Sequence, residues 1–304
     1  MTLLPVERPE DFLLAEQFII PHEETCVSLA SLVRRKSDKL FFIIDSDKTV
    51  VSIQPLRGHS TTIVGIINLD STIYHCLPDI SKIDAAALKE NLPYLMKKPV
   101  KCISGESAGT EFLIDVFKCG FDTAAARPLN HPVQIYPYKM LRWLSASEAG
   151  VSKPPQTSDL LSGGEEIIRC TEHDLEALHP LQKDYMKDEV AVPGRTITDA
   201  EVDITLRNIL KNQLCFALLC DGEPVAKANT NAIGINCVQI GGVYTHPLYR
   251  RNGYAGALVQ ALCSRAEHAH RKPVLFVKEK NTPAFNLYQK LGFEECGRYM
   301  IAYY

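Results

Sequence analysis

A short run between residues 249 and 256, Tyr-Arg-Arg-Asn-Gly-Tyr-Ala-Gly, has the residue types that could bind a phosphorylated ligand. It joins a strand-like segment to a helix-like one, and the first amides of a helix have no intrahelical partner. The helix dipole also favours negative charge there. Gly253 and Gly256 would let a pyrophosphate approach the backbone, while Arg250 and Arg251 add positive charge. The run matches neither the G-x-G-x-x-G dinucleotide fingerprint nor the P-loop.

A second run, Gly105-Glu106-Ser107-Ala108-Gly109, has the G-x-S-x-G spelling of a serine hydrolase's nucleophile elbow. It lies between a strand-like and a helix-like segment, as that motif requires. A hydrolase of this type also needs a glycine-rich oxyanion loop and a downstream acid and histidine. The sequence has no His-Gly-Gly run, and most of its downstream histidines fall in the other half of the chain. A nucleophilic Ser107 is therefore the least favoured reading.

The second half of the chain predicts the elements that would position the 249–256 run. Apolar spacing indicates helices, continuous apolar runs indicate buried strands, and Asp221-Gly222 is a hairpin turn signal. The predicted elements are a strand at 165–171, helices at 172–190 and 198–213, a three-stranded meander within 214–247, a helix at 250–270, a strand at 273–277, a helix at 281–293 and a strand at 298–304.

The first half predicts a similar order of elements. These are a helical region at 10–35, strands at 39–45, 49–55, 61–68 and 71–77, a helix at 84–98, a strand at 100–104, a helix at 110–121 and a strand at 132–143. Between the halves, residues 145–166 are rich in Ser, Gly and Pro, which is typical of a linker.

Two segments of the second half together resemble the acyl-CoA site of the GCN5-related N-acetyltransferase (GNAT) superfamily, in its FR47-like branch. The first is VYTHPLYRRNGYAGALV, in which Arg250, Gly253 and Ala255 match the family's Q/R-x-x-G-x-G/A pattern. The second is NTPAFNLYQKLGF, at 281–293, which resembles the family's fourth helix. The resemblance covers residues 165–304.

This resemblance implies transfer of an acetyl group from acetyl-CoA to a primary amine by direct attack, without an acyl-enzyme. A non-catalytic CoA-binding or scaffold protein is the main alternative. The implied cofactor-binding residues are Val243, Tyr244, Thr245, Arg250, Arg251, Asn252, Gly253, Tyr254, Ala255, Gly256 and Asn281.

The resemblance also implies catalytic roles. Tyr288 would protonate the leaving thiolate, which suits a side chain with an ordinary pKa of about 10 and a thiol product near about 8.5. Several family members carry a glutamate base on the fourth strand, but residues 236–247 contain no carboxylate. Glu189 is the base that we select, while Asp188, His246 and a chain of waters stay open.

The GESAG run has a simpler explanation than hydrolysis. The segment from Gly109 to Phe121 aligns with residues 281–293, so the first half resembles a second GNAT-like unit. In it, Gly109 replaces Asn281, and Val116 replaces Tyr288. The region that matches the cofactor loop has no glycine and carries Asp79 and Asp84, whose carboxylates would repel phosphates. We therefore expect a degenerate repeat that has lost cofactor binding.

The expected fold is α+β, with two tandem GNAT-like domains that each have a mixed, mostly antiparallel sheet flanked by helices. The expected ranges are a degenerate domain at 1–146, a linker at 147–164 and a catalytic domain at 165–304.

The amino-acid composition limits the classes of molecule that the protein is expected to bind. The chain is 46% hydrophobic and 23% charged, with net charge −3, so it is typical of a globular protein and not of a nucleic-acid binder. The sequence shows neither a signal peptide nor a long apolar span, and its ten cysteines form no C-x-x-C. We expect a cytoplasmic enzyme with reduced thiols, no metal, no membrane partner and a small-molecule or peptide amine as acceptor. A homodimer stays open.

Overall fold

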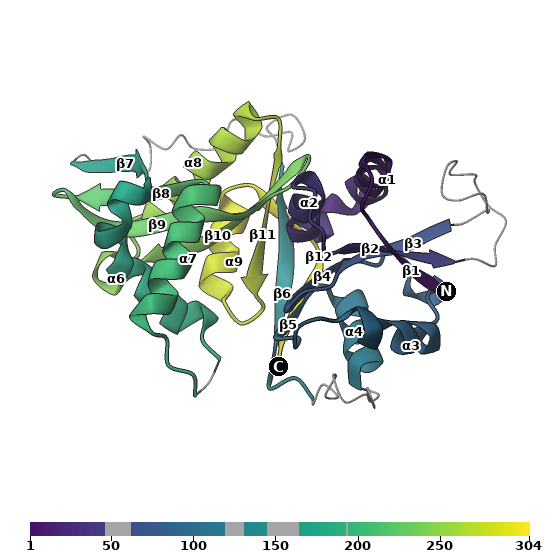
Figure 1. Cartoon of the computed structure of the whole chain (residues 1–304). Helices are drawn as coiled ribbons and strands as arrows, with labels where there is room; N and C mark the ends of the chain where they lie inside the picture. Colours follow the sequence, from purple (N-terminus) through teal and green to yellow (C-terminus); the bar gives the residue numbers. More distant parts are fainter. Residues whose placement is uncertain (46–61, 119–130, 145–163, 193) are drawn as a thin grey trace. The chain divides into compact units, whose positions relative to one another are not determined.

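The computed structural model describes residues 1–45, 62–118, 131–144, 164–192 and 194–304 (Figure 1). The strand expected at 49–55 lies outside these residues, as does the expected linker apart from Gly164. The chain divides into two compact units. Unit 1 is Met1–Lys139 with Gly297–Tyr304, and unit 2 is Met140–Cys296.

Unit 1 contains a sheet whose strands run in the order β1-β2-β3-β4-β5 and then the end of β12. Strands β4 and β5 are parallel, and the other pairs are antiparallel. Its elements are β1 (Thr2–Pro5), α1 (Pro9–Ile19), η1 (Ile20–Thr25), α2 (Val27–Arg34), β2 (Leu40–Asp45), β3 (Thr62–Asn68), β4 (Thr72–Cys76), η2 (Ile80–Lys82), α3 (Ala85–Leu95), β5 (Cys102–Glu106), α4 (Ser107–Lys118) and β12 (Phe293–Tyr303).

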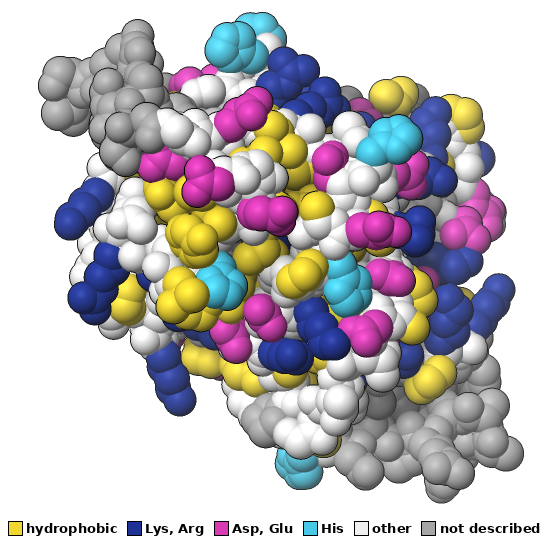
Figure 2. Space-filling model, turned by 90° about the vertical axis from the view of Figure 1, so that its left-hand side faces the viewer, with side chains coloured by type: hydrophobic (Ala, Val, Ile, Leu, Met, Phe, Trp, Pro, Cys, Tyr) yellow, Lys and Arg dark blue, Asp and Glu magenta, His cyan; other side chains and the backbone are white. Residues whose placement is uncertain are grey.

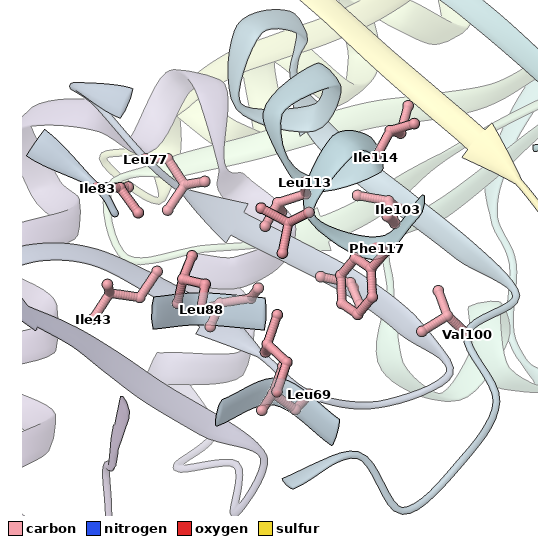
Figure 3. Close-up of a cluster of buried hydrophobic side chains, with 14 of the residues drawn as sticks. Ile43, Leu69, Leu77, Ile83, Leu88, Val100, Ile103, Leu113, Ile114 and Phe117 are labelled. Atoms are coloured by element: carbon pink, nitrogen blue, oxygen red, sulfur yellow. The ribbon is translucent and has the colours of Figure 1, made fainter. Parts of the chain in front are cut away.

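Helices cover both faces of the unit 1 sheet, because each face has its own hydrophobic core. On one face, Leu88 of α3 and Phe117 of α4 pack with Ile103 of β5, and their side chains point toward one another in Figure 3. On the other face, side chains of α1 and α2 pack against β2 and β3, with Phe42 completely buried. A sheet buried on both faces explains why these strands are nearly continuous apolar runs.

Unit 2 repeats this plan with the strand order β7-β8-β9-β10-β11-β6. Strands β10 and β11 are parallel, while β7, β8, β9 and β10 pair antiparallel. Its elements are the end of β6 (Gln134–Trp143), β7 (Glu165–Arg169), η4 (Glu172–Asp174), α6 (Leu175–Tyr185), η5 (Met186–Val190), α7 (Asp199–Asn212), β8 (Cys215–Cys220), β9 (Glu223–Ile233), β10 (Cys237–Thr245), η6 (Pro247–Tyr249), α8 (Tyr254–His268), β11 (Lys272–Lys278), α9 (Thr282–Lys290) and the start of β12.

Local sequence signals explain several of these boundaries. Helix α7 begins with a capping box, in which Thr198 and Glu201 each accept the other's backbone N–H. Asp221 and Gly222 both adopt positive φ in the turn between β8 and β9, as a tight hairpin requires. Side chains of α8 and α9 form one core of unit 2 and those of α6 and α7 another.

The expected α+β class is confirmed, with mostly antiparallel sheets flanked by helices. Strand β1 was not predicted, because four residues at the start of the chain carry too little pattern. The final strand of each unit also departs from the expected order, in which each domain would be one continuous stretch of sequence. Gly297–Tyr304 groups with unit 1, although it follows unit 2 in sequence. The domain ranges inferred from the sequence stay a prediction.

Among the described helices, none combines the length and hydropathy that a bilayer span needs. The face drawn in Figure 2 mixes acidic and basic side chains, and its described part shows no broad basic area.

Candidate functional site

The candidate site lies where two neighbouring strands of unit 2 part. Strands β10 and β11 pair in parallel from Cys237–Lys272 to Ile240–Leu275, and no pairing continues beyond. Both strands nevertheless run on, β10 to Thr245 and β11 to Lys278. The backbone groups of these end segments are therefore not used in pairing the two strands with each other.

A bulge in β10 follows directly. The register with β9 shifts between Gly241 and Tyr244, which leaves two residues of β10 opposite one of β9. Gly242 has φ 58°, and a Cβ on it would lie 2.0 Å from Oδ1 of Asn229. Only glycine fits this backbone, so the bulge explains Gly242. At Gly241 the reason is different, since a Cβ there would lie 2.1 Å from Nδ2 of Asn231.

The turn η5 connects to both parting strands. The hydroxyl of Tyr244 on β10 donates to Asp188 Oδ2 at 3.1 Å. The ammonium of Lys278 on β11 lies 2.6 Å from the Glu189 carbonyl oxygen and 3.2 Å from its Oε2. Asp188 and Glu189 thus each hold one of the two strands. The side chain of Glu189 stays 36% exposed, so its carboxylate remains open to solvent.

Two tyrosines lie close to this turn. Tyr288 of α9 is buried, and desolvation raises its pKa well above 10, with smaller contributions from Tyr185 and the negative charge of Glu189. Burial likewise raises the pKa of Tyr185 to about 12. Of the two catalytic residues selected from the sequence, Glu189 thus acts on Tyr288 electrostatically, since its negative charge contributes to the raised pKa of the tyrosine. The hydroxyls of Tyr288 and Tyr185 both keep their protons at neutral pH.

Helix α8 begins without a side-chain cap. Its N-cap residue is Gly253, with φ 81°, and the first intrahelical bond runs from the Ala257 N–H to the Gly253 carbonyl at 3.0 Å. The amides ahead of Ala257 are therefore available to an external acceptor. Arg250 and Arg251 are exposed beside them, and Arg251 also has positive φ.

The corresponding helix of unit 1 begins differently. Helix α3 follows β4, as α8 follows β10, but its N-cap is Asp84. The Asp84 carboxylate accepts the N–H groups of Ala86 and Ala87 at 2.9 and 3.3 Å. Asp79 caps the short turn η2 in the same way. These carboxylates occupy the amides that a phosphate would need, which supports the expected loss of cofactor binding in unit 1.

The expected cofactor residues fall into three groups. Those at 250–253 are exposed, and Ala255 and Gly256 belong to the first turn of α8. The rings of Tyr244 and Tyr254 are buried, and the Tyr254 hydroxyl donates to Glu165 Oε1 at 3.0 Å. These two residues can offer only backbone groups.

The remaining three expected residues flank the parted strands. Val243 lies in the bulge, and the Thr245 hydroxyl is buried with no hydrogen-bond partner in the described part of the chain. Asn281 caps α9, since its Oδ1 accepts the Ala284 N–H at 3.2 Å. Its amide nitrogen is the part of the side chain left for a ligand.

The GESAG run of unit 1 has a packing explanation. A Cβ on Gly105 would lie 2.1 Å from the His75 ring, and one on Gly109 would lie 2.6 Å from it. The ring is fully buried, and its Nε2 bonds the Thr110 hydroxyl at 2.9 Å, with no bond to Ser107. The two glycines therefore make room for His75.

Sequence reasoning missed several residues of the site, namely Tyr185, Lys227, Asn229 and Lys278. One signal was present. Lys227, Asn229 and Asn231 alternate along β9, and polar residues at every second position of a central strand are unusual. Among the described residues, no cluster of histidine, cysteine and carboxylate side chains could hold a metal ion.

Comparison with known protein families gives a match within unit 2. Residues 176–293 match the model of the acetyltransferase (GNAT) family. No curated protein matches the sequence significantly.

Solved structures match over nearly the whole chain. A Drosophila protein shares 12% identity over 99% of this chain and 98% of its own, with a TM-score of 0.57. A GNAT-family acetyltransferase from Colwellia psychrerythraea shares 11% identity over 100% and 99%, with a TM-score of 0.52. A putative GNAT-family acetyltransferase from Novosphingobium aromaticivorans shares 15% identity over 92% and 96%, with a TM-score of 0.51. At these identities, the likeness establishes the fold. The family match marks residues 176–293 of unit 2, which include the parted strands and the start of α8, as a GNAT domain.

Proposed function

We propose that unit 2 transfers an acetyl group from acetyl-CoA to a primary amine by direct attack. One observation carries this proposal: the uncapped start of α8 lies directly after a strand that has parted from its neighbour. Free helix amides bind phosphate, and unpaired strand backbone binds an extended amide chain. A phosphorylated cofactor with a peptide-like arm matches both features.

The residues present fit such a cofactor. Gly253 places no side chain over the helix start, and Arg250 and Arg251 supply positive charge for a pyrophosphate. The buried Thr245 hydroxyl lacks a partner within the described residues, so it can bond a group that lies along β10. Cofactor binding would use the backbone of Val243, Tyr244 and Thr245 for the arm.

The catalytic step needs a base for the amine and an acid for the sulfur. Glu189 is partly exposed, so its carboxylate can accept a proton from an incoming ammonium directly or through water. Tyr288 is protonated at neutral pH, since the ordinary pKa of a tyrosine is about 10 and burial raises that of Tyr288 further, and it can donate its proton to the leaving thiolate. Attack of the neutral amine on the thioester carbonyl then yields the amide and free CoA.

Calorimetric titration with acetyl-CoA, together with thiol release from a panel of amines, tests this function. We expect one site per chain and amine-dependent thiol release. Gly253→Glu should abolish both, since a carboxylate would repel the phosphates at the helix start. Gly222→Glu is the matched control, because Gly222 has nearly the same φ, 82° against 81°, but lies in the turn between β8 and β9.

Equal binding by Gly253→Glu and Gly222→Glu would overturn the assignment of the loop. A second site would show that unit 1 also binds the cofactor. Binding without thiol release from any amine would favour the non-catalytic alternative.

A further inference from the structure

The side chain of Lys227 is completely buried, in the central strand β9 of unit 2. Burying an ammonium is costly, and buried lysines are usually paired with a carboxylate. Among the described residues, none forms an ion pair with Lys227. Its hydrogen-bond partners are the neutral oxygens of Asn229 and Gly242, and its Nζ lies 5.2 Å from the centre of the Tyr185 ring. Burial accordingly lowers the pKa of Lys227. A methionine would fill the same space at lower cost, so the amino group itself needs an explanation.

The contacts of Lys227 converge on one residue of β10. Its Nζ donates to the Gly242 carbonyl at 3.0 Å and to Asn229 Oδ1 at 2.9 Å. Asn229 Oδ1 in turn packs against Gly242, since a Cβ there would lie 2.0 Å away. The ammonium lies 5.2 Å from the centre of the Tyr185 ring, and the Gly242 backbone hydrogen-bonds Tyr185. Three side chains therefore hold Gly242.

Gly242 is the point at which ordinary strand pairing fails. Tyr244 pairs with Lys227 and Gly241 pairs with Asn229, so Gly242 and Val243 have no partner on β9. Strand β11 has already parted from β10 at Ile240. The Gly242 carbonyl thus lacks a ladder donor on either side, and Lys227 supplies one from a side chain. An unsatisfied buried carbonyl would otherwise favour collapse of the bulge into regular pairing.

We propose that Lys227 is a positioning residue, whose buried amino group holds the β10 bulge in the conformation that presents Val243 to the cofactor arm. This inference rests on the proposed acetyl-CoA site. It assigns to β9 a role that does not involve contact with either substrate.

The test compares wild type with Lys227→Met, which keeps the length of the side chain but removes the donor. We expect the variant to be as stable to heat as wild type or more stable, because its side chain costs less to bury. Its Kd for acetyl-CoA should nevertheless rise at least tenfold, while KM for the amine stays within twofold. Hydrogen exchange in a peptide spanning 238–245 should accelerate. A purely structural lysine would instead lower stability and leave the Kd unchanged.

Gly242→Ala provides a second variant in case Lys227→Met does not fold. It leaves Lys227 intact but forces the bulge to move, since its Cβ would meet Asn229. It should weaken acetyl-CoA binding similarly.

The outcomes separate the two proposals. If wild type binds acetyl-CoA and Lys227→Met binds it equally well, with unchanged exchange at 238–245, the role of Lys227 is overturned and the function stands. If wild type binds no acetyl-CoA, both are overturned.

Discussion

At the scale of single residues, His75 illustrates how a sequence that matches a catalytic motif, here GESAG at 105–109, can arise from packing requirements. Its ring lies against Gly105 and Gly109, where larger residues would overlap it, and it bonds Thr110. The ring is fully buried, and burial lowers the pKa of His75 from 6.5 to about 3. Protonation of His75 therefore opposes folding of unit 1.

This depressed pKa predicts an acid-sensitive stability. Above pH 6.5 the imidazole is neutral in both the folded and the unfolded chain, and its contribution is fully present. As the pH falls from 6.5 toward 3, only the unfolded chain takes up the proton, so stability is lost at about 1.4 kcal/mol per pH unit. Between pH 7 and pH 5, urea unfolding of wild type should lose about 2 kcal/mol more than that of His75→Gln.

The comparison with His75→Gln isolates the histidine, because acidic groups titrate similarly in both proteins. His173→Gln, which alters an exposed histidine, should keep the wild-type dependence. Parallel pH profiles for wild type and His75→Gln would show that His75 is not buried in the neutral form.

At the scale of elements, helices α3 and α8 occupy corresponding positions in their units, but the N-terminus of α3 is capped by a side chain and that of α8 is not. Asp84 occupies the first amides of α3, whereas Gly253 leaves those of α8 open. A side-chain cap stabilises a helix, and since glycine is a tolerated N-cap residue, α8 forgoes only a few tenths of a kcal/mol that α3 retains. A helix start that binds a ligand cannot also be capped by its own side chain.

Replacing the cap should therefore affect only the stability of unit 1. Asp84→Ala should lower the free energy of unfolding by about 1 kcal/mol in chemical denaturation. Acetyl-CoA affinity should not change, because the cap belongs to the unit without the open helix start. Glu90→Ala, at an exposed position of the same helix, serves as the control and should be nearly neutral. A loss of acetyl-CoA affinity in Asp84→Ala would place the cofactor in unit 1 instead.

At the scale of the whole molecule, the two units have equivalent strand orders, but no single position in the sequence separates them. The last residues of the chain, 297–304, belong to unit 1. The end of β12 pairs antiparallel with β5, from Tyr299–Glu106 to Tyr303–Cys102. Tyr299 and Ala302 are buried there, and the Tyr299 hydroxyl bonds Ser104 at 2.8 Å. Residues 140–143 of β6 group with unit 2, where the Trp143 indole N–H donates to the Leu291 carbonyl at 3.0 Å.

Truncation after Cys296 should thus destabilise unit 1, although most of that unit lies at the other end of the sequence. Removal of residues 297–304 exposes the edge of β5 and deletes buried side chains from the unit 1 core. In hydrogen-exchange mass spectrometry, residues 102–106 should lose protection, while the β8–β9 hairpin of unit 2 keeps it. Tyr299→Phe, which removes only one hydroxyl, should retain most of the protection. Unchanged exchange at 102–106 in the truncated chain would contradict the assignment of residues 297–304 to unit 1.

Local sequence patterns were sufficient to predict most of the elements, and they also led to the prediction of the cofactor loop. Periodicity, turn residues and caps are local properties, so strands such as β2 and β3 and the Asp221-Gly222 turn could be predicted from short windows. Helix α8 was predicted at 250–270 and is found at Tyr254–His268. The family resemblance added the expected roles of Tyr288 and Glu189, which stay predictions.

Other features become visible only once the chain is folded. The bulge at Gly242, the burial of Lys227 and the exchange of final strands each depend on residues far apart in the chain. Such contacts leave no periodic signal, because a lysine or a glycine pair reads locally as a solvated charge or a loop. The same holds for GESAG, since the room that Gly105 and Gly109 provide is needed only once β4 brings His75 beside them.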